Sequence, residues 1–377
     1  MDKQNVVNEY DAIIIGSGTC GATIARELSK QNKKVLILER GGNTPLKESF
    51  LTFAAINDVV SLGDKLMAMR ALTTGGSTAL YFAVADLPPL DIFMSLGIDL
   101  TRELDETRKE LPIAQLPDEL MGTQAIRLRE GASQLGYQWK KKLMLIDQSK
   151  STSGYSYEAK WKARSFVQEA IGYGATLINR AMVSKVLVDN NNQAVGVEYN
   201  LNKISFKAYG TKIILAAGSS ASPIILRDSG IKNIENHGFF IDPSCALFGI
   251  VPGLKAKDNY MGSMSTEYED DILVGDLNAT RFFYKMLMLA NGKPGRFFSY
   301  SNSIGIGVKV KDNLGGEIRK NNHYYKPLTE EDRKKLKLGG EKALKILKSA
   351  GATKIFHSAY GATDLGGTIK IQKHMRH

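Results

Sequence analysis

Three glycines follow an apolar run near the start of the chain, at a spacing that suits phosphate binding. Gly16, Gly18 and Gly21 come directly after Ala12-Ile13-Ile14-Ile15 and precede a stretch with helical periodicity. In a strand–turn–helix unit the first glycine permits the tight turn, the second lets a pyrophosphate approach the backbone, and the third lets the helix pack close to the strand. The backbone amides at the start of that helix then face the phosphates.

An acidic residue closes the next apolar run. Val35–Leu38 predicts a second strand, and Glu39 follows it 18 residues beyond Gly21, where a carboxylate can accept hydrogen bonds from a ribose diol. With the glycines, this spacing predicts a dinucleotide site; the alternative is a glycine-rich turn that holds no ligand. Further contacts to the dinucleotide are expected from the neighbouring residues Ser17, Thr19, Cys20 and Arg40.

A second strand-to-helix crossover with small side chains lies later in the chain. Lys212–Leu215 predicts a short buried strand that runs into Ala216-Ala217-Gly218-Ser219, and Ser222-Pro223 begins a helix. With so little side-chain bulk, a flat, extended cofactor can lie against the backbone. Ala217 and Gly218 are the residues expected to contact it.

The second crossover resembles the second signature of the glucose–methanol–choline (GMC) oxidoreductases. Thr74–Leu80 is similar to the first signature of that family, which implies that Gly75, Gly76 and Ser77 contact a flavin. Tyr81 takes the place of the family's usual Asn or His, so the match to the first signature is partial.

Another segment resembles the part of the family that contacts adenine. This segment is Met182–Val186, and the backbone of Val183 is the contact that the resemblance implies. The alternative is that Val183 is simply a core residue of a strand.

The resemblance extends from residue 10 to about residue 371 and implies an α/β fold. We expect a Rossmann-like, doubly wound FAD-binding domain and a substrate domain that contains an antiparallel sheet. FAD is the implied cofactor and a small-molecule alcohol the implied substrate: hydride leaves a CH–OH group for flavin N5 while a base takes the hydroxyl proton. The expected FAD domain comprises residues 1–95, 160–243 and 352–377, the mostly helical excursion residues 96–159, and the substrate domain residues 244–351.

The residue at the family's catalytic position is unusual. The resemblance places the family's histidine base at Thr363, whose hydroxyl has a pKa far above neutrality and cannot act as the base. Asp364 and His357 are the candidate substitutes, which leaves the catalytic group open. Family members continue beyond the position of His377 with a strand and a helix. We therefore expect a truncated C-terminus and a possible partner chain that supplies this element.

Two other functions compete with an alcohol-oxidising flavoenzyme. One is a non-catalytic or split flavin-binding scaffold, which the loss of the histidine favours. The other is a dehydrogenase that uses nicotinamide alone. The second crossover and the expected hairpin at residues 182–199 argue against it, because they form an additional nucleotide-contacting layer.

The composition disfavours several other classes. With 50 Lys and Arg against 39 Asp and Glu the formal net charge is +11, but the basic residues are spread along the chain and accompany no nucleic-acid motif. A solvated basic surface is favoured, and an acidic substrate, a partner or a membrane surface are the alternatives. The 2 cysteines and 5 histidines show no metal-ligand spacing, so no metal is expected. With no signal peptide and no apolar run long enough for a membrane span, the cytoplasm is the expected location.

Periodicity also predicts local structure. Residues 46–70 are amphipathic and are expected to be helical. Residues 182–189 and 194–199 are expected to form a hairpin around Asn190-Asn191-Asn192. Thr329 is expected to cap a helix that ends at Gly351.

Overall fold

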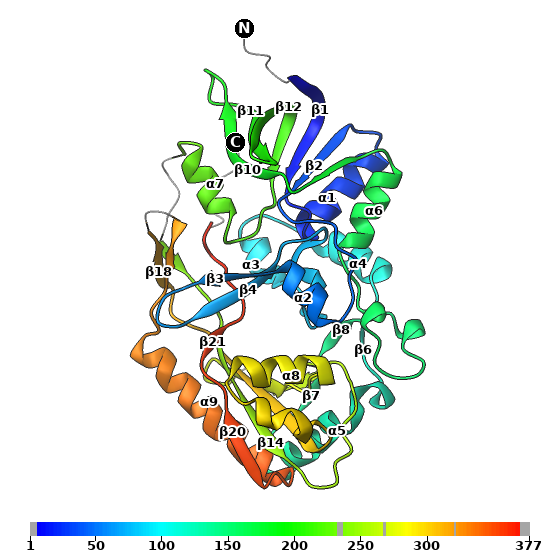
Figure 1. The fold of residues 1–377 in the computed structure, drawn as a ribbon, viewed down its shortest axis with the longest axis vertical. Helices are drawn as coiled ribbons and strands as arrows, with labels where there is room; N and C mark the ends of the chain where they lie inside the picture. Colours follow the sequence, from blue (N-terminus) through cyan, green and yellow to red (C-terminus); the bar gives the residue numbers. More distant parts are fainter. Residues whose placement is uncertain (1–5, 232–236, 267–268, 320–321, 370–377) are drawn as a thin grey trace.

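Two sheets, one above the other in Figure 1, organise the chain. The computed structural model describes residues 6–231, 237–266, 269–319 and 322–369. We refer to the two halves as the upper and the lower lobe.

The upper lobe is a mostly parallel sheet with helices on it. Its elements are β1 (Val6–Ile15), α1 (Thr19–Lys30), β2 (Val35–Glu39), α6 (Arg164–Gly172), β9 (Thr176–Asn179), β10 (Met182–Val188), β11 (Ala194–Leu201), β12 (Ile204–Leu215) and α7 (Ser222–Asp228). The strand order is β10-β11-β12-β1-β2-β9. Ile13 and Ile14 of β1 are fully buried and belong to separate hydrophobic clusters, one on each face of the sheet. This is the pattern of a central parallel strand that is covered on both sides.

The lower lobe is an antiparallel sheet between helices. Its elements are α5 (Asp118–Gln134), β7 (Lys140–Lys141), β14 (Pro243–Ile250), β15 (Met264–Ser265), β16 (Ile272–Asp276), α8 (Arg281–Ala290), η4 (Pro294–Asn302), β17 (Ser303–Val310), α9 (Glu330–Ser349), β20 (Lys354–His357) and β21 (Gly361–Ala362). The strand order is β20-β14-β17-β16-β15-β7, and β21 pairs with the start of β14. Along β14, Leu247 packs into the cluster beneath α9, whereas Phe248 packs into the cluster beneath α8. The alternation of β14 therefore places these two helices on opposite faces.

Shorter elements connect the lobes and cover their edges. These are α2 (Phe50–Ile56), β3 (Asn57–Ser61), β4 (Met67–Ala71), η1 (Gly76–Ala79), β5 (Val84–Ala85), α3 (Leu90–Ser95), α4 (Thr101–Glu110), β6 (Ile113–Gln115), β8 (Leu143–Leu145), η2 (Gln148–Lys150), η3 (Tyr157–Ala159), β13 (His237–Phe239), β18 (Gly315–Ile318) and β19 (Tyr324–Tyr325). They form a two-stranded β3–β4 hairpin and the small sheets β5-β8-β6 and β13-β18-β19.

The expected helix over residues 46–70 is wrong for most of its length. Only α2 is helical, and β3 and β4 follow it as an antiparallel pair. The chain reverses at Gly63, Asp64 and Lys65, which all have positive φ angles of 78°, 48° and 63°. A right-handed helix cannot include three such residues, whereas a tight turn between strands can.

Other local predictions are confirmed. β10 and β11 pair as the expected hairpin, and Thr329 caps α9 in a capping box with Asp332. The sequence assigns residues 352–377 to the expected FAD domain. In the structure β20, within that range, pairs with β14 and so lies in the lower sheet.

Candidate functional site

The first glycine loop closes against the second crossover. Gly16 has a φ of 100°, and a Cβ there would lie 2.5 Å from the carbonyl oxygen of Ala216. A Cβ on Gly21 would lie 2.0 Å from the carbonyl oxygen of Gly16. Gly18 differs, because a Cβ there would meet no heavy atom within 4 Å. The fold itself therefore requires Gly16 and Gly21, whereas Gly18 borders open space.

Helix α1 begins at this open space with its amides unused. Gly18 is the N-cap residue, no side chain caps the helix, and the first turn contains no acidic residue. Thr19 and Cys20, in that turn, are exposed. The first amides of a helix have no partner inside the helix, and the macrodipole adds positive potential there. An anionic group is the ligand that this arrangement fits.

Glu39 joins the end of β2 to this loop. Its side chain is buried and accepts hydrogen bonds from the backbone N–H of Ser17 (3.0 Å), the hydroxyl of Ser17 (2.6 Å) and the backbone N–H of Gly41 (2.6 Å). The Ser17 hydroxyl in turn accepts from the backbone N–H of Gly75, at 3.1 Å. A carboxylate has about four acceptor positions, so one remains for a ligand hydroxyl.

The loop that resembles the first signature packs directly on the first glycine loop. A Cβ on Gly76 would lie 2.9 Å from the Cα of Gly18. Ser77 is exposed, and its hydroxyl accepts from the backbone N–H of Ala71 at 3.2 Å. The guanidinium of Arg164 fixes the loop by donating to the Thr74 carbonyl at 3.2 Å, and it also donates to the residues Thr44 (2.9 Å) and Thr73 (3.0 Å). Sequence reasoning missed Arg164, whose role depends on contacts with residues 90 to 120 positions away in the chain.

The second crossover completes the group of loops. Gly218 has a φ of 80°, and a Cβ there would meet no heavy atom within 4 Å. Ala217 is partly buried against the cluster that contains Val183. Val183 is buried in that cluster, so its side chain is a core contact. Arg40 is exposed beside the end of β2.

Together these loops fit a dinucleotide. Three glycine-containing loops converge, the start of α1 is uncapped, and two glycines, Gly18 and Gly218, border open space. The buried carboxylate of Glu39 lies at the same edge of the sheet as the loop. These residues suit the diphosphate and ribose of a dinucleotide.

The C-terminal candidates lie in a charged cluster at the start of β14. The Thr363 hydroxyl donates to the carbonyl oxygen and carboxylate of Asp242, at 2.7 and 3.0 Å. Lys309 forms ion pairs with Asp242 (2.7 Å) and Asp364 (3.2 Å). Burial lowers the pKa of Lys309, but the two carboxylates outweigh burial and raise it above its ordinary value. Asp364 is therefore an ion-pair partner, and its side chain is largely exposed.

The same segment continues to the second crossover. The Ser219 hydroxyl donates to the carbonyl oxygen of Leu365, and the Thr368 hydroxyl donates to the carbonyl oxygen of Ser219. His357 lies elsewhere: it is opposite Leu247 on β14, whereas Ala362 is opposite Pro243. Four residues of strand, about 13 Å, separate these positions, so His357 is not brought to Thr363.

A buried ion pair supports this part of the lower lobe. Lys326 and Asp312 form it at 3.1 Å, and each side chain is 1% exposed. Asp312 also accepts from the backbone N–H groups of Ile241 and Asp242. The pair thereby fixes the backbone that presents Asp242 to Thr363.

A cluster of lysines and tyrosines, which sequence reasoning missed, lies against the first-signature loop. The Tyr157 hydroxyl donates to the carbonyl oxygen of Ala79 at 2.9 Å, and the backbone N–H of Ala163 donates to the Thr78 hydroxyl at 3.1 Å. The ammonium of Lys160 lies 5.3 Å from the ring centre of Tyr155 and 5.8 Å from that of Tyr157.

Lys160 is the unusual member of this cluster. Burial lowers its pKa to about 8, although Glu48 opposes the shift. Burial also lowers the pKa of Lys162 to about 8, but the Lys162 ammonium donates to the carbonyl oxygens of Tyr157 (2.7 Å) and Lys160 (3.1 Å). Within the described part of the chain, the contacts of the Lys160 ammonium are with these two aromatic faces, and no carbonyl oxygen or carboxylate accepts a hydrogen bond from it.

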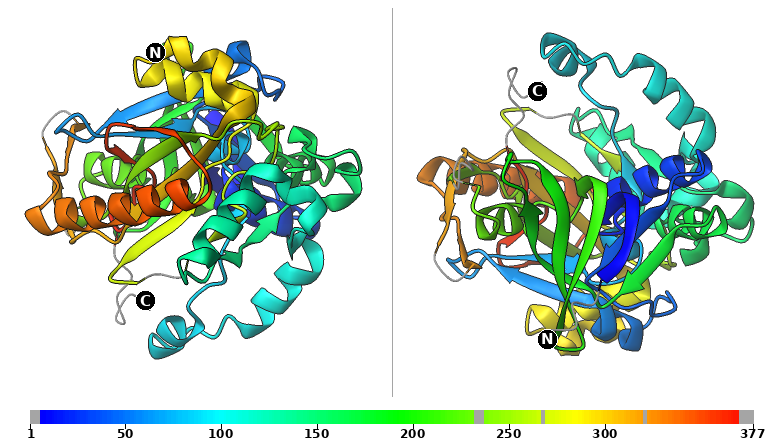
Figure 2. Two further views of the ribbon diagram at one scale, coloured as in Figure 1. Left: turned by 90° about the horizontal axis from the view of Figure 1, so that it is seen from below. Right: turned by 90° about the horizontal axis from the view of Figure 1, so that it is seen from above.

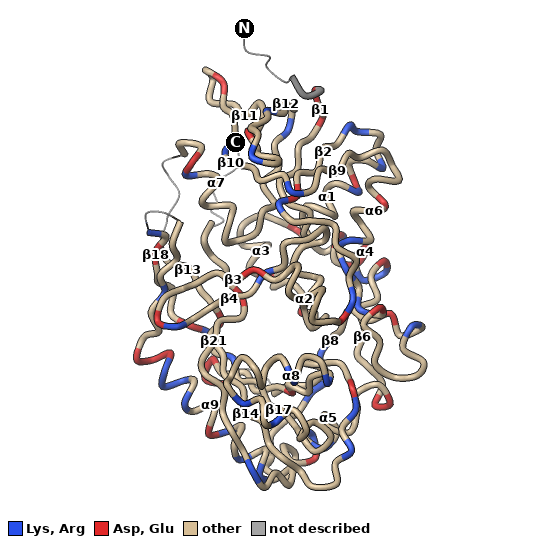
Figure 3. Tube along the Cα trace, in the orientation of Figure 1, with Lys and Arg blue, Asp and Glu red and all other residues tan. Residues whose placement is uncertain are grey.

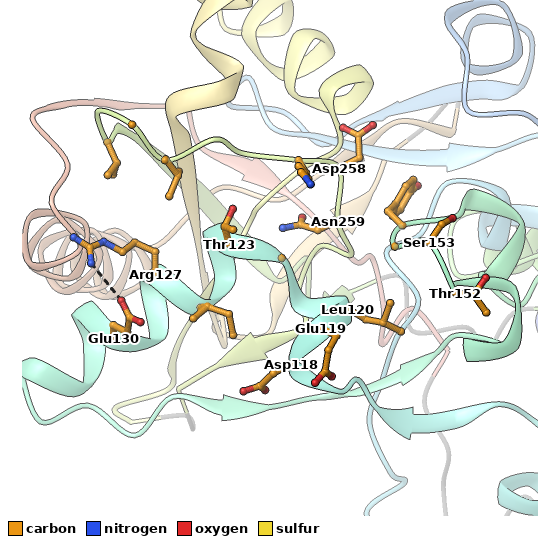
Figure 4. A pocket seen from close by; sticks show the side chains of 18 of the residues that line it. Asp118, Glu119, Leu120, Thr123, Arg127, Glu130, Thr152, Ser153, Asp258 and Asn259 are labelled. Carbon is orange, nitrogen blue, oxygen red and sulfur yellow. Dashed lines mark hydrogen bonds and ion pairs between the residues drawn. The ribbon is translucent and has the colours of Figure 1, made fainter.

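A cleft of about 1000 Å³ adjoins the cluster (Figure 4). It lies between α5 and the segments 152–155 and 251–259. Tyr155 lines the cleft, and its hydroxyl donates to Glu48 at 2.9 Å. Both signs of charge line the cleft, with Asp118, Glu119 and Asp258 among the acidic residues and Arg127 and Lys257 the basic ones. The glycine loops are not part of its wall.

Comparison with known proteins points to one family. The family model described as GMC oxidoreductase matches residues 94–248, and that of an NAD(P)-binding Rossmann-like domain matches residues 14–45. A GMC-type oxidoreductase of Mycobacterium tuberculosis is 24% identical over 274 residues, which are 65% of this chain and 43% of that one. The chain is therefore similar to the GMC oxidoreductases over the residues that these matches cover. This likeness implies a flavin cofactor.

Two further GMC relatives extend the comparison. The long-chain-alcohol oxidase FAO3 of Arabidopsis thaliana is 21% identical over 400 residues, 92% of this chain and 53% of that one. The crystal structure of pyridoxine 4-oxidase from Mesorbium loti matches with a TM-score of 0.64 and 15% identity, over 92% of this chain and 81% of that one. At this identity the structural likeness shows the fold. The chain spans about half the length of the curated plant and mycobacterial relatives.

The described residues contain neither a candidate metal site nor a candidate membrane-spanning helix. No group of three or more His, Cys, Asp or Glu in the described ranges is placed to hold a metal ion. Over the same ranges, no helix has both the length and the apolar character needed to cross a membrane. His374 and His377, which the sequence also offers, lie outside the described residues.

Proposed function

We propose that this protein binds FAD and oxidises the CH–OH group of a small-molecule alcohol. The observation that carries the proposal is the convergence of three glycine-containing loops at the uncapped start of α1, with the buried carboxylate of Glu39 beside it. The plant relative, a long-chain-alcohol oxidase, supports an alcohol as the substrate.

Each loop has a role in holding the cofactor. The amides that follow Gly18 would bind the diphosphate, and Glu39 would accept a hydrogen bond from the ribose. The backbone at Val183 would contact the adenine, as the resemblance of Met182–Val186 to the family implies, while its side chain packs in the core. When bound, FAD supplies the acceptor for the hydride of the alcohol.

Lys160 is the residue that we assign to the hydroxyl proton of the substrate. A neutral amine can accept a proton, and a group whose pKa lies near the working pH does so most effectively. With a pKa of about 8, half of the Lys160 side chains are neutral near pH 8. The Thr363 hydroxyl, by contrast, is committed as a donor to Asp242.

A second function is favoured by the residue at position 363. In this alternative, the chain has no histidine at that position to accept the proton. It acts as a flavin-binding scaffold and depends on a partner chain for the proton acceptor. For either function we propose the cytoplasm as the compartment, because Cys20 is an exposed free thiol and Cys245 is also unpaired.

The test is the visible absorption spectrum of the purified chain before and after addition of FAD, followed by anaerobic titration with short- and long-chain primary alcohols. The proposal predicts flavin bands that bleach when an alcohol is added. Lys160→Met is expected to keep the bands and to slow bleaching at least about tenfold. Lys203→Met, at an exposed turn, is the matched control.

The outcomes separate the two functions. Bound flavin that no alcohol reduces favours the scaffold, and the absence of flavin binding refutes both. Bleaching at an unchanged rate in Lys160→Met refutes the assignment of Lys160 and leaves the oxidase standing.

A further inference from the structure

Seven large apolar side chains are exposed on five elements near the junction of the lobes. Leu51 is 80% exposed and Phe298 94% exposed. The full set, which we call the apolar face, is Phe50 and Leu51 of α2, Val59, Met67 and Met69 of the β3–β4 hairpin, Leu289 of α8 and Phe298 of η4. Single exposed apolar residues are ordinary, but a concentration of them marks an interaction site.

Register and contacts place these residues on one side of the molecule. Val59 is opposite Met69 and Ser61 is opposite Met67, so the three apolar residues of the hairpin share one face. α2 leads directly into β3, and Glu48 just before α2 accepts a hydrogen bond from Thr280, the N-cap of α8. In both views of Figure 2 the hairpin, α2 and the α8–η4 region lie along the same edge of the molecule.

The charge on these elements is positive. Lys47, Lys65, Arg281 and Lys285 are exposed, and no ion pair with a carboxylate is recorded for any of them within the described residues. The acidic residues nearby are engaged: Glu48 accepts from Tyr155 and Thr280. Asp58 pairs with Arg70, and Asp64 with Arg333. Figure 3 shows Lys and Arg interspersed with Asp and Glu over both lobes.

We propose that the apolar face docks on the surface of an anionic lipid bilayer. Aromatic and aliphatic side chains that protrude beside lysines suit a bilayer interface, where the side chains enter the acyl boundary and the lysines meet lipid phosphates. Each basic residue near an anionic membrane strengthens the attraction to it. A second copy of the chain fits less well, because joining two such faces would bring lysines against lysines. This inference concerns a surface outside the glycine loops and does not depend on the proposed function.

Binding of the full chain to vesicles tests the proposal. The expected result is co-sedimentation with vesicles of phosphatidylcholine and phosphatidylglycerol at 7:3, and much weaker binding to phosphatidylcholine alone or at high salt. Leu51→Ser with Phe298→Ser is expected to lower the partition coefficient at least about tenfold, because two exposed side chains no longer insert. The control is Ile204→Ser with Leu314→Ser, two exposed sites (56% and 65%) outside the apolar face.

A charge variant distinguishes binding to anionic lipid from nonspecific hydrophobic adsorption. Lys285→Glu should weaken binding to the anionic vesicles, whereas Lys203→Glu, on the hairpin between β11 and β12, should not. The proposal is overturned if the chain does not bind anionic vesicles or if both serine pairs lose binding equally. It is also overturned if the chain is a dimer in sedimentation that Leu51→Ser with Phe298→Ser converts to a monomer. Circular dichroism of each variant checks that the fold is retained.

Discussion

Replacement of Gly18 by alanine separates the folding role of the glycine loop from its binding role. Gly18 has φ −66° and ψ −171°, a backbone conformation that alanine adopts without strain. A Cβ there meets no heavy atom within 4 Å, so the methyl group enters the open space beside the start of α1. We therefore expect the free energy of unfolding without FAD to change by less than about 1 kcal/mol, with a gain as plausible as a loss because alanine restricts the unfolded chain.

The effect on FAD binding should be large. A methyl group holds a diphosphate away from the backbone amides that would otherwise bind it, and each charge-assisted hydrogen bond contributes about 1.5–3 kcal/mol. Loss of one such bond corresponds to a weakening of roughly 10- to 150-fold in the dissociation constant. Urea denaturation followed by circular dichroism measures the first quantity, and titration with FAD followed by flavin fluorescence measures the second.

Two comparisons make the Gly18 experiment decisive. Gly172→Ala, at the end of α6, has equally open surroundings but lies away from the loops, so it should alter neither quantity. Gly21→Ala should instead destabilise the fold, because its Cβ would lie 2.0 Å from a carbonyl oxygen. Tight FAD binding by Gly18→Ala would refute the placement of the diphosphate.

Three further changes probe separate features. Glu39→Gln should lower the free energy of urea unfolding by about 2 kcal/mol, because a backbone N–H that now donates to the carboxylate would face an amide N–H. Glu198→Gln, which loses a partly exposed ion pair, should change the free energy of unfolding by less than about 1 kcal/mol. Equal effects of the two substitutions would count against the hydrogen-bond network of Glu39. Asp312→Asn should lower the free energy of unfolding by about 3–5 kcal/mol, because the Lys326 ammonium stays buried without its counter-ion; a loss below 1 kcal/mol would contradict this. For Lys160, the folded pKa of about 8 lies below the unfolded value of about 10.4, so the buried ammonium destabilises the fold below pH 8, and the cost fades as the pH rises to 10.4. Lys160→Met should therefore raise the free energy of unfolding at pH 7 by about 3 kcal/mol and match the native chain near pH 10.4, whereas a pH-independent difference would show that the amine is not buried as described.

Local sequence determined the glycine loop, its flanking strand and helix, and the hairpin at residues 182–201. Each depends on residues within one short stretch: a glycine where φ is positive, an apolar run where a strand is buried, a polar turn where the chain reverses. The capping box of α9 is equally local, since Thr329 and Asp332 are one turn apart. The β3–β4 hairpin was missed because its outer face carries Val59 and Met69, although Gly63-Asp64 marked the turn.

Tertiary structure decided which residues meet. Asp242 and Thr363 are 121 positions apart, and Arg164 is 91 positions from Thr73, yet both pairs are hydrogen-bonded. No periodicity can reveal such pairs, because they arise from the order of strands in a sheet. The lowered pKa of Lys160 likewise comes from tertiary burial against two tyrosines, which outweighs the opposing effect of Glu48, far away in the chain. A sequence states which groups can titrate, and only the packed fold sets the solvent and the charges around them.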